Sequence, residues 1–448
     1  MTTHHTGSPP TSTPTTTPTT RLPRNHPFHL LLSAAAISRF GTSVSQLAVP
    51  LTAVAALGAS PGQVGVLGAL GTASFVLVGL PAGAWVDRLP KRPVMISADL
   101  VRAVLLLSLP VAWWLGALTL PHLYLVTFAA GLATVFFDVA TTSFLPHVVG
   151  RPALMTANSR LVAADAVNDI GGRGVGGFVV QLVGGPLTIL VDAMSYLGSA
   201  LCLVFLRSTE PAAARHGGAG LRREITDGVR FVLGNPVLRA FLTAGVCTNV
   251  SIIMINTMLP VVFVRELGLS ATALGLYLAV GGVGALIGSL TARRLADRLG
   301  HGRALWLAGL WIAPVGFLVP FVDRGALLWA AAASWFITAV KVGVDNVIKV
   351  SFRQLVTPPH LLARMNATFR FLLTGALSIG AGLAGLLGEL AGPRAALWVG
   401  AIGLAVVWVP IYFSPVRSVR SPSTDPDPDP DRPAPTNRTN DPERRPRS

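Results

Sequence analysis

The sequence predicts an all-α membrane protein with twelve transmembrane helices in two six-helix, pseudo-symmetric bundles. First, 51% of its 448 residues are hydrophobic and only 12% are charged, about half the charged fraction of a typical soluble domain. Second, apolar runs of about 20 residues, the length that spans a bilayer, recur along almost the whole chain. Third, a short charged turn occurs twice at a fixed interval, which indicates an internally duplicated chain and favours a transporter.

The duplicated turn is the clearest local pattern in the chain. Gly83–Arg92 reads G-A-W-V-D-R-L-P-K-R, and Arg293–Arg303 reads R-R-L-A-D-R-L-G-H-G-R. In both copies an apolar run ends, an Asp-Arg pair follows, and further cations precede the next apolar run. The pair at 87–88 recurs at 297–298, which is 210 positions later.

The apolar runs divide the chain into five predicted segments. Residues 1–27 and 415–448 are rich in Thr, Pro, Asp and Arg and are expected to be disordered cytoplasmic tails. Between them we expect an N-terminal bundle at 28–207, a cytoplasmic linker at 208–236 and a C-terminal bundle at 237–414. The expected spans are 28–57, 61–86, 93–117, 121–149, 155–184, 186–207, 237–264, 271–295, 303–322, 326–353, 361–388 and 393–414.

The linker contains a predicted amphipathic helix. From Leu221 the sequence L-R-R-E-I-T-D-G-V-R-F-V-L places its apolar residues on one stripe and its charges elsewhere. Two interpretations remain open for this helix. It lies on the inner membrane surface, or it packs only on cytoplasmic loops.

The net charge of +15 is explained by topology rather than by nucleic acid. The cations gather in the turns that follow the even-numbered spans and in the central loop, as the positive-inside rule requires. This distribution predicts a multi-pass protein of the cytoplasmic membrane with both termini in the cytoplasm. Cys202 and Cys247 lie within apolar runs without the spacing of a metal site, so no metal and no cofactor are expected.

Several charged residues lie inside the predicted spans, where each costs on the order of 3 kcal/mol. They are candidates for proton coupling or substrate binding: Arg39, Asp138, Asp165, Asp169, Arg173, Lys341 and Asp345. Four-residue spacing pairs Asp169 with Arg173, and Asp345 with both Lys341 and Lys349, on one helical face. The alternative is that these pairs only neutralise each other and fix helix packing.

Asp138 is the first candidate for a protonatable carboxylate. It has no cation within four residues along the chain, and Arg39 is a possible partner across a central cavity. The alternative role for Asp138 is that of a structural hydrogen-bonding residue.

These patterns resemble the major facilitator superfamily. The turn G-x-x-x-D-R-x-x-K-R at Gly83–Arg92 is similar to the superfamily signature between its second and third helices. The stretches at Phe136–Val149, Arg353–Ala367 and Asp192–Leu197 resemble its macrolide-efflux-like drug exporter branch. Gly171–Gly177 is similar to the antiporter signature of the fifth helix, although Arg173 stands where proline is expected.

The resemblance implies a secondary exporter of a small hydrophobic or amphipathic drug or metabolite, working by alternating access with proton antiport. It also implies a gate at the two charged turns, whose residues are Gly83, Asp87, Arg88, Lys91, Arg92, Asp297 and Arg298. In this hypothesis each aspartate faces the N-terminus of a neighbouring helix when the cytoplasmic side is closed. The alternative is that the turns only determine topology. Arg173 is also a candidate for an anionic substrate group, balanced by Asp169.

Two other functions are alternatives to export. An uptake permease for a small polar solute has the same architecture, and only the resemblance separates the two. A non-transporting membrane sensor would normally carry a folded soluble domain, which neither tail resembles. The sequence shows no nucleophile–base pair, metal cluster or phosphate loop, so no enzyme is expected. The expected partners are a small-molecule substrate, protons and membrane lipids, with no nucleic acid, and the protein is expected to be a monomer.

Overall fold

The computed structural model describes residues 26–150, 153–206 and 221–418. Most of the predicted tails and the first part of the predicted linker therefore lie outside the described residues. The N-terminal half consists of helices α1 (His26–Leu51), α2 (Pro61–Asp87), α3 (Lys91–Trp114), α4 (Leu120–Val149), α5 (Leu154–Val183) and α6 (Gly185–Phe205). These six helices lie within a few residues of the six expected spans.

The second half begins with the linker helix α7 (Leu221–Gly234). It continues with α8 (Pro236–Val261), α9 (Ala271–Leu299), α10 (His301–Gly316), α11 (Ala326–Leu355), α12 (Leu362–Ala391), α13 (Pro393–Val406) and α14 (Val409–Tyr412). The last expected span is divided between α13 and the short α14. Within the described part of the chain, nine helices are long and apolar enough to cross a membrane. Among the others, α10 is short at 16 residues, and α5 carries several charges.

A second repeat, which the charged turns did not reveal, lies at the ends of α1 and α8. Pro50 and Pro260 lie near the ends of these helices, 210 positions apart. Each helix then changes to a five-residue π-helical turn, at Thr52–Ala56 and Val262–Glu266. A proline cannot donate the main-chain hydrogen bond that continues an α-helix, and π-turns inside α-helices are frequent at functional sites. The duplication therefore includes the backbone irregularity as well as the charges.

The same repeat continues into the following loops as L-G-A-S at 57–60 and L-G-L-S at 267–270. The glycines have φ angles of 64° at Gly58 and 57° at Gly268. Because only glycine adopts this backbone region without steric cost, both loops require it. In the first copy, Ser60 then caps α2: its hydroxyl accepts from the Gln63 N–H, and the Gln63 side chain accepts from the Ser60 N–H. This reciprocal cap fixes the start of α2.

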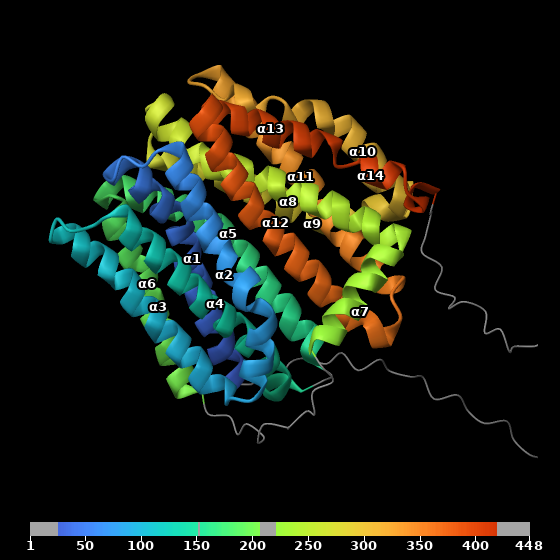
Figure 1. Cartoon of the computed structure of the whole chain (residues 1–448), viewed down its shortest axis with the longest axis horizontal. Helices are drawn as coiled ribbons and strands as arrows, with labels where there is room; N and C mark the ends of the chain where they lie inside the picture. Colours follow the sequence, from blue (N-terminus) through green and yellow to red (C-terminus); the bar gives the residue numbers. More distant parts are fainter. Residues whose placement is uncertain (1–25, 151–152, 207–220, 419–448) are drawn as a thin grey trace, which may run out of the picture. The chain divides into compact units, whose positions relative to one another are not determined.

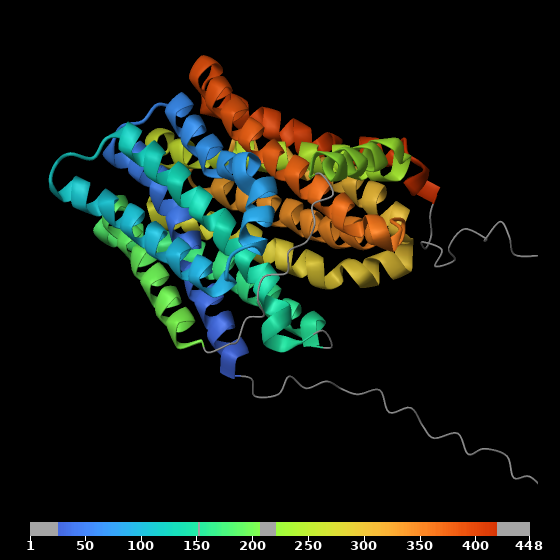
Figure 2. The ribbon, with the colours of Figure 1, turned by 60° about the horizontal axis from the view of Figure 1, so that its bottom comes forward.

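The chain forms two compact units whose boundaries differ from those of the repeat. The first contains residues 1–217, 256–282 and 377–396, and the second contains residues 218–255, 283–376 and 397–448. In the first unit, α1 packs on α5 and α6, α3 on α4 and α6, and α2 on α4. Figures 1 and 2 show the neighbouring ribbons of α3, α4 and α6. The core of this unit is apolar and includes Phe28, Leu31, Met95, Phe144 and Leu203.

Two glycine contacts join helices of different repeats within the first unit. A Cβ atom on Gly65 of α2 would lie 2.3 Å from the Gly385 Cα of α12. A Cβ atom on Gly177 of α5 would lie 2.6 Å from the Ala271 carbonyl oxygen and 2.9 Å from the Gly275 Cα of α9. Any side chain would collide with main-chain atoms, so these positions need glycine for the helices to approach this closely. We refer to the two contacts as the glycine crossings.

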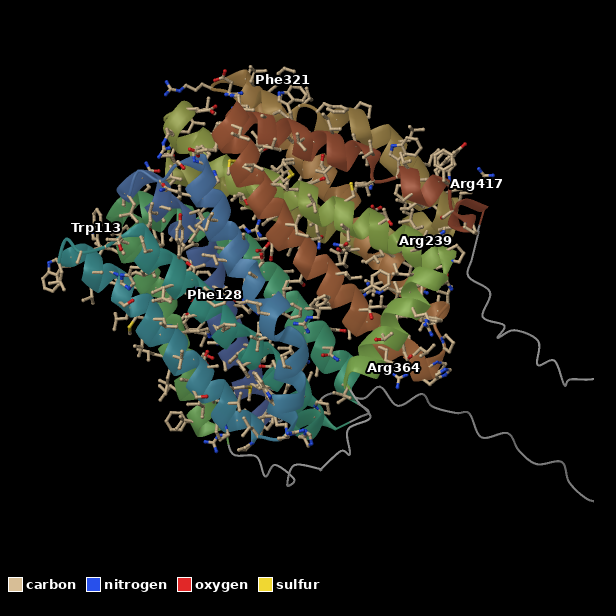
Figure 3. All side chains as sticks on the ribbon, viewed as in Figure 1. Trp113, Phe128, Arg239, Phe321, Arg364 and Arg417 are labelled. Carbon is tan, nitrogen blue, oxygen red and sulfur yellow. The ribbon has the colours of Figure 1, made fainter. Side chains whose placement is uncertain are left out.

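The linker helix α7 packs on the start of α12 in the second unit. Val232 is fully buried in the apolar core of that unit. A Cβ atom on Gly228 would lie 2.6 Å from the Thr368 hydroxyl. Asp227 lies 3.5 Å from Arg364, which is labelled in Figure 3 at the start of α12. The helix is therefore fixed by protein contacts on this side, and its contact with a membrane surface stays a prediction.

Candidate functional site

Arg39 lies between two carboxylates that come from different helices. Its Nη2 atom is 2.7 Å from Asp138 Oδ1, and its Nε atom is 3.8 Å from Asp165 Oδ1. Arg39 is in the middle of α1, Asp138 is on α4 and Asp165 is on α5, so the three residues meet only because these helices pack together. The side chains of Arg39, Asp138 and Asp165 are 39%, 22% and 52% exposed. Asp138 thus has the cationic partner expected from the sequence, and Asp165 shares it.

The charged group continues along α5. Asp169 Oδ1 lies 2.9 Å from Arg173 Nη2, one helical turn away. The side-chain amide of Asn168 donates to the Ala36 carbonyl oxygen at 2.9 Å and ties α5 to α1 beside the charges. Three carboxylates and two guanidinium groups leave one negative charge in this cluster. Partly exposed charges inside membrane spans face the bundle interior or a water-filled cavity, because lipid cannot solvate them.

Lys341 and Asp345 lie in a separate cluster on α11, together with Lys349. Asp345 Oδ2 accepts from the Lys341 ammonium at 2.7 Å and from the Lys349 ammonium at 3.1 Å. All three side chains are at least nine-tenths buried. The four-residue spacing therefore does bring Asp345 together with both lysines, as expected from the sequence.

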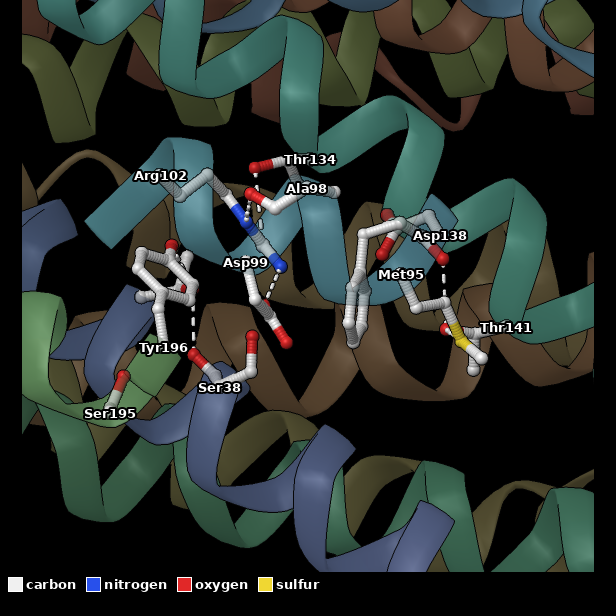
Figure 4. A network of polar contacts seen from close by, with 12 residues as sticks. Ser38, Met95, Ala98, Asp99, Arg102, Thr134, Asp138, Thr141, Ser195 and Tyr196 are labelled. Carbon is white, nitrogen blue, oxygen red and sulfur yellow. Dashed lines mark hydrogen bonds and ion pairs between the residues drawn. The ribbon is translucent and has the colours of Figure 1, made fainter. Parts of the chain in front are cut away.

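A third charged cluster was missed by sequence reasoning. Asp99 and Arg102 on α3 form a fully buried ion pair, shown in Figure 4. The Arg102 guanidinium lies 4.1 Å from the Tyr196 ring centroid and 4.5 Å from the Phe137 ring centroid. It thus contacts aromatic side chains of both α6 and α4. The spacing of an acid and an arginine three apart within an apolar run was the signal that could have revealed it.

The buried polar network extends to α6 and α1. Asp192 is 1% exposed and accepts from the Ser195 hydroxyl at 3.2 Å. Tyr196 and Thr42 hydroxyls lie 3.0 Å apart. A Cβ atom on Gly41 would lie 2.5 Å from Asp192 Oδ1, so α1 needs glycine where it meets this carboxylate. These buried polar contacts therefore connect α1, α3, α4 and α6 to one another. Two of these helices, α1 and α4, also carry Arg39 and Asp138, which together with Asp165 we call the Arg39 group.

This buried polar network gives a test of stability. Arg102→Met is expected to destabilise the protein by about 3–5 kcal/mol, because it leaves the Asp99 carboxylate uncompensated in an apolar interior. The double variant Arg102→Met/Asp99→Asn is expected to recover much of that loss. Thermal unfolding of the purified protein measures both, with Arg88→Met, an exposed cation, as control. Equal stability of the single variant and the wild type would contradict the structural role.

The first charged turn has a defined backbone in the structure. Asp87 is the last residue of α2, and its side chain lies outside what the structure describes. Arg88 caps the helix and is exposed, and Lys91 is the first residue of α3. Arg92 donates to the main-chain oxygens of Leu203 at 2.9 Å and Val204 at 2.5 Å, at the end of α6. Arg92 therefore fixes α6 to α3 within one bundle.

The remaining residues of the expected gate lie on the surface of their own helices. A Cβ atom on Gly83 would meet nothing within 4 Å. Asp297 lies 4.0 Å from Arg293 in an exposed pair along α9, and Arg298 is exposed. Among the described residues no group of three or more His, Cys, Asp or Glu side chains is placed to hold a metal ion.

Comparison with known proteins identifies the family. A family model described as "Transmembrane secretion effector", of the major facilitator type, matches residues 17–443. The chain belongs to this family. The chain is 27% identical over 403 residues to the multidrug efflux pump Tap of Mycolicibacterium fortuitum, covering 87% of this chain and 96% of that protein. It is also 27% identical to Tap of Mycobacterium tuberculosis H37Rv, covering 86% and 93% of the two chains.

Solved structures confirm the predicted fold class. The chain matches a bacterial homologue of the iron transporter ferroportin with a TM-score of 0.70 at 17% identity, covering 86% of this chain and 97% of that one. It matches the nucleoside transporter NupG with a TM-score of 0.70 at 13% identity, covering 86% and 99%. These likenesses establish the fold alone. The protein is thus a multi-pass membrane transporter with the major facilitator fold, as the sequence predicted.

Proposed function

We propose that this transporter exports a small hydrophobic or amphipathic compound across the cytoplasmic membrane in exchange for protons. The direction of transport is supported by the relatives named as multidrug efflux pumps. Proton coupling is supported by one observation above all: Arg39 lies between Asp138 and Asp165 on three different helices. Both termini lie in the cytoplasm in this proposal, because the cations gather in the turns on that side.

The Arg39 group can link protonation to helix position. Arg39 has one strong partner in this structure, Asp138, and a second acceptor, Asp165, slightly farther away. A proton on Asp138 removes the charge that holds the guanidinium, so Arg39 then pairs with Asp165. Because the two acids belong to α4 and α5, this exchange of partners favours a different packing of the helices around α1. Protonation thereby biases an equilibrium between two states.

The direct test is transport in everted membrane vesicles against a panel of hydrophobic and amphipathic compounds. An imposed proton gradient, acidic inside, is expected to drive accumulation, and an ionophore that dissipates the gradient is expected to abolish it. Accumulation that ignores the gradient would remove the antiport proposal. Accumulation only in right-side-out vesicles would instead establish an uptake permease.

The charged turn gives a separate prediction about gating. Asp87→Asn is expected to reduce transport strongly while leaving membrane insertion intact, because the neutral side chain no longer stabilises the closed cytoplasmic gate. Initial rates in vesicles, normalised to the amount of inserted protein, measure the effect. Asp297→Asn in the second copy is the matched comparison and is expected to have the smaller effect, since that copy lacks the first glycine of the turn. Normal transport by Asp87→Asn would reduce the turn to a topology signal.

A further inference from the structure

The buried triad on α11 carries an uncompensated charge. Two ammonium groups, of Lys341 and Lys349, share the single carboxylate of Asp345. This leaves one positive charge at a place where all three side chains are at least nine-tenths buried. In the described part of the chain, Asp345 is the carboxylate that lies within 4 Å of either lysine. Burying an unpaired charge costs several kcal/mol, so the position favours a counter-ion.

A small cavity lies next to the triad and is lined by residues of α8, α10, α11 and α13. Its volume is about 20 Å³, and its lining includes Lys341, Thr248 and Thr338. A space of this size holds one water molecule or one monatomic ion. All of the lining residues belong to the second compact unit.

The cavity also has an unused hydrogen-bond donor. Thr338 is 5% exposed, and its hydroxyl has no hydrogen-bond partner among the residues that the structure describes. It precedes Lys341 by three residues, so the two side chains lie on the same face of α11. The Thr248 hydroxyl, in contrast, donates to the Ala244 carbonyl oxygen at 2.8 Å. Buried polar groups normally have partners, and a lone hydroxyl beside an excess ammonium is complementary to an anion.

We propose that this cavity binds a small monovalent anion of the halide class, held by the Lys341 ammonium and the Thr338 hydroxyl. One anion would both neutralise the excess positive charge of the triad and accept a hydrogen bond from the Thr338 hydroxyl. A water molecule satisfies the hydroxyl but leaves the positive charge uncompensated. The inference does not depend on the direction of transport or on proton coupling, because it concerns binding within one unit.

Thermal unfolding of the purified full-length protein in chloride tests the proposal. At constant ionic strength, replacing sodium gluconate by sodium chloride is expected to raise the unfolding midpoint saturably by about 2–4 °C. Bromide is expected to replace chloride. A midpoint that does not depend on the anion, or that rises without saturation, would overturn the proposal.

Two variants test separately the contribution of the Thr338 hydroxyl and that of the excess positive charge. Thr338→Val keeps the shape of the side chain and removes the hydroxyl, whereas Lys349→Met removes the excess charge without altering a residue that lines the cavity. Both are expected to lose the chloride shift. Thr291→Val, at an exposed threonine on α9, is expected to keep it. A full shift in Thr338→Val contradicts the proposal even if Lys349→Met fails to fold.

Discussion

Asp138→Asn is expected to reduce transport driven by a proton gradient strongly while preserving exchange of substrate for substrate. The neutral amide cannot bind or release a proton, and Arg39 is expected to pair permanently with Asp165, which lies 3.8 Å away in the wild type. A coupling free energy of about 1–3 kcal/mol between the proton site and the substrate site changes a binding equilibrium by about 5- to 150-fold. We therefore expect gradient-driven accumulation in everted vesicles to fall by about that factor, with counterflow at equal pH little changed.

The control for this experiment is Asp323→Asn. Asp323 is exposed in the loop before α11, where it accepts from the Arg324 main-chain N–H at 2.7 Å. Its replacement removes a carboxylate from the same protein without changing the Arg39 group. Asp165→Asn is expected to resemble Asp138→Asn, since both acids contact the one arginine. If Asp138→Asn retained full gradient-driven accumulation, the coupling residue would lie elsewhere.

Gly177→Ala is expected to open the crossing of α5 and α9. The added methyl group would lie 2.6 Å from the Ala271 carbonyl oxygen, so the helices must separate. Overpacking typically costs about 1–3 kcal/mol, which shifts a two-state population by about 5- to 150-fold. We expect slower transport and a larger fraction of molecules in which α5 and α9 are separated at this crossing. Gly65→Ala is expected to have the same effect through the crossing of α2 and α12.

Thiol labelling measures the opening directly. Thr72 lies two turns beyond Gly65 on α2, and its hydroxyl is 2.8 Å from the Ser378 hydroxyl. In a chain without Cys202 and Cys247, Thr72→Cys is expected to react with an impermeant maleimide mainly when Gly177→Ala is present.

Matched controls for this measurement lie on the same helices. A Cβ atom on Gly382 of α12 would meet nothing within 4 Å, and one on Gly174 of α5 would only touch the Ala279 Cβ at 4.0 Å. Alanine at either position is expected to leave labelling unchanged. If Thr72→Cys were labelled equally in Gly177→Ala and Gly174→Ala, the crossing of α5 and α9 would not control the opening.

The charged turns and the lengths of the apolar runs were sufficient to predict the helices, because membrane spans have a fixed length and cations mark their ends. The pairing of Arg39 with Asp138 was also expected, since a charge inside a span needs a partner. The sharing of Arg39 by Asp165 was not expected, because it depends on how three helices pack. The pairing of Asp99 with Arg102 was not expected either, because the run that contains them, Lys91–Trp114, is apolar enough to span a membrane in spite of these two charges.

The glycine crossings carry information about the ancestry of the chain. Gly65 corresponds to Gly275 in the second copy, 210 positions later, and Gly177 corresponds to Gly385, 208 positions later. Each crossing therefore joins one position of the first copy to the non-equivalent position of the second. Two identical six-helix subunits with both glycines would form the same seam twice around a two-fold axis, as in an isologous dimer. The two crossings therefore have the arrangement expected of an isologous contact between two copies of a half-length unit.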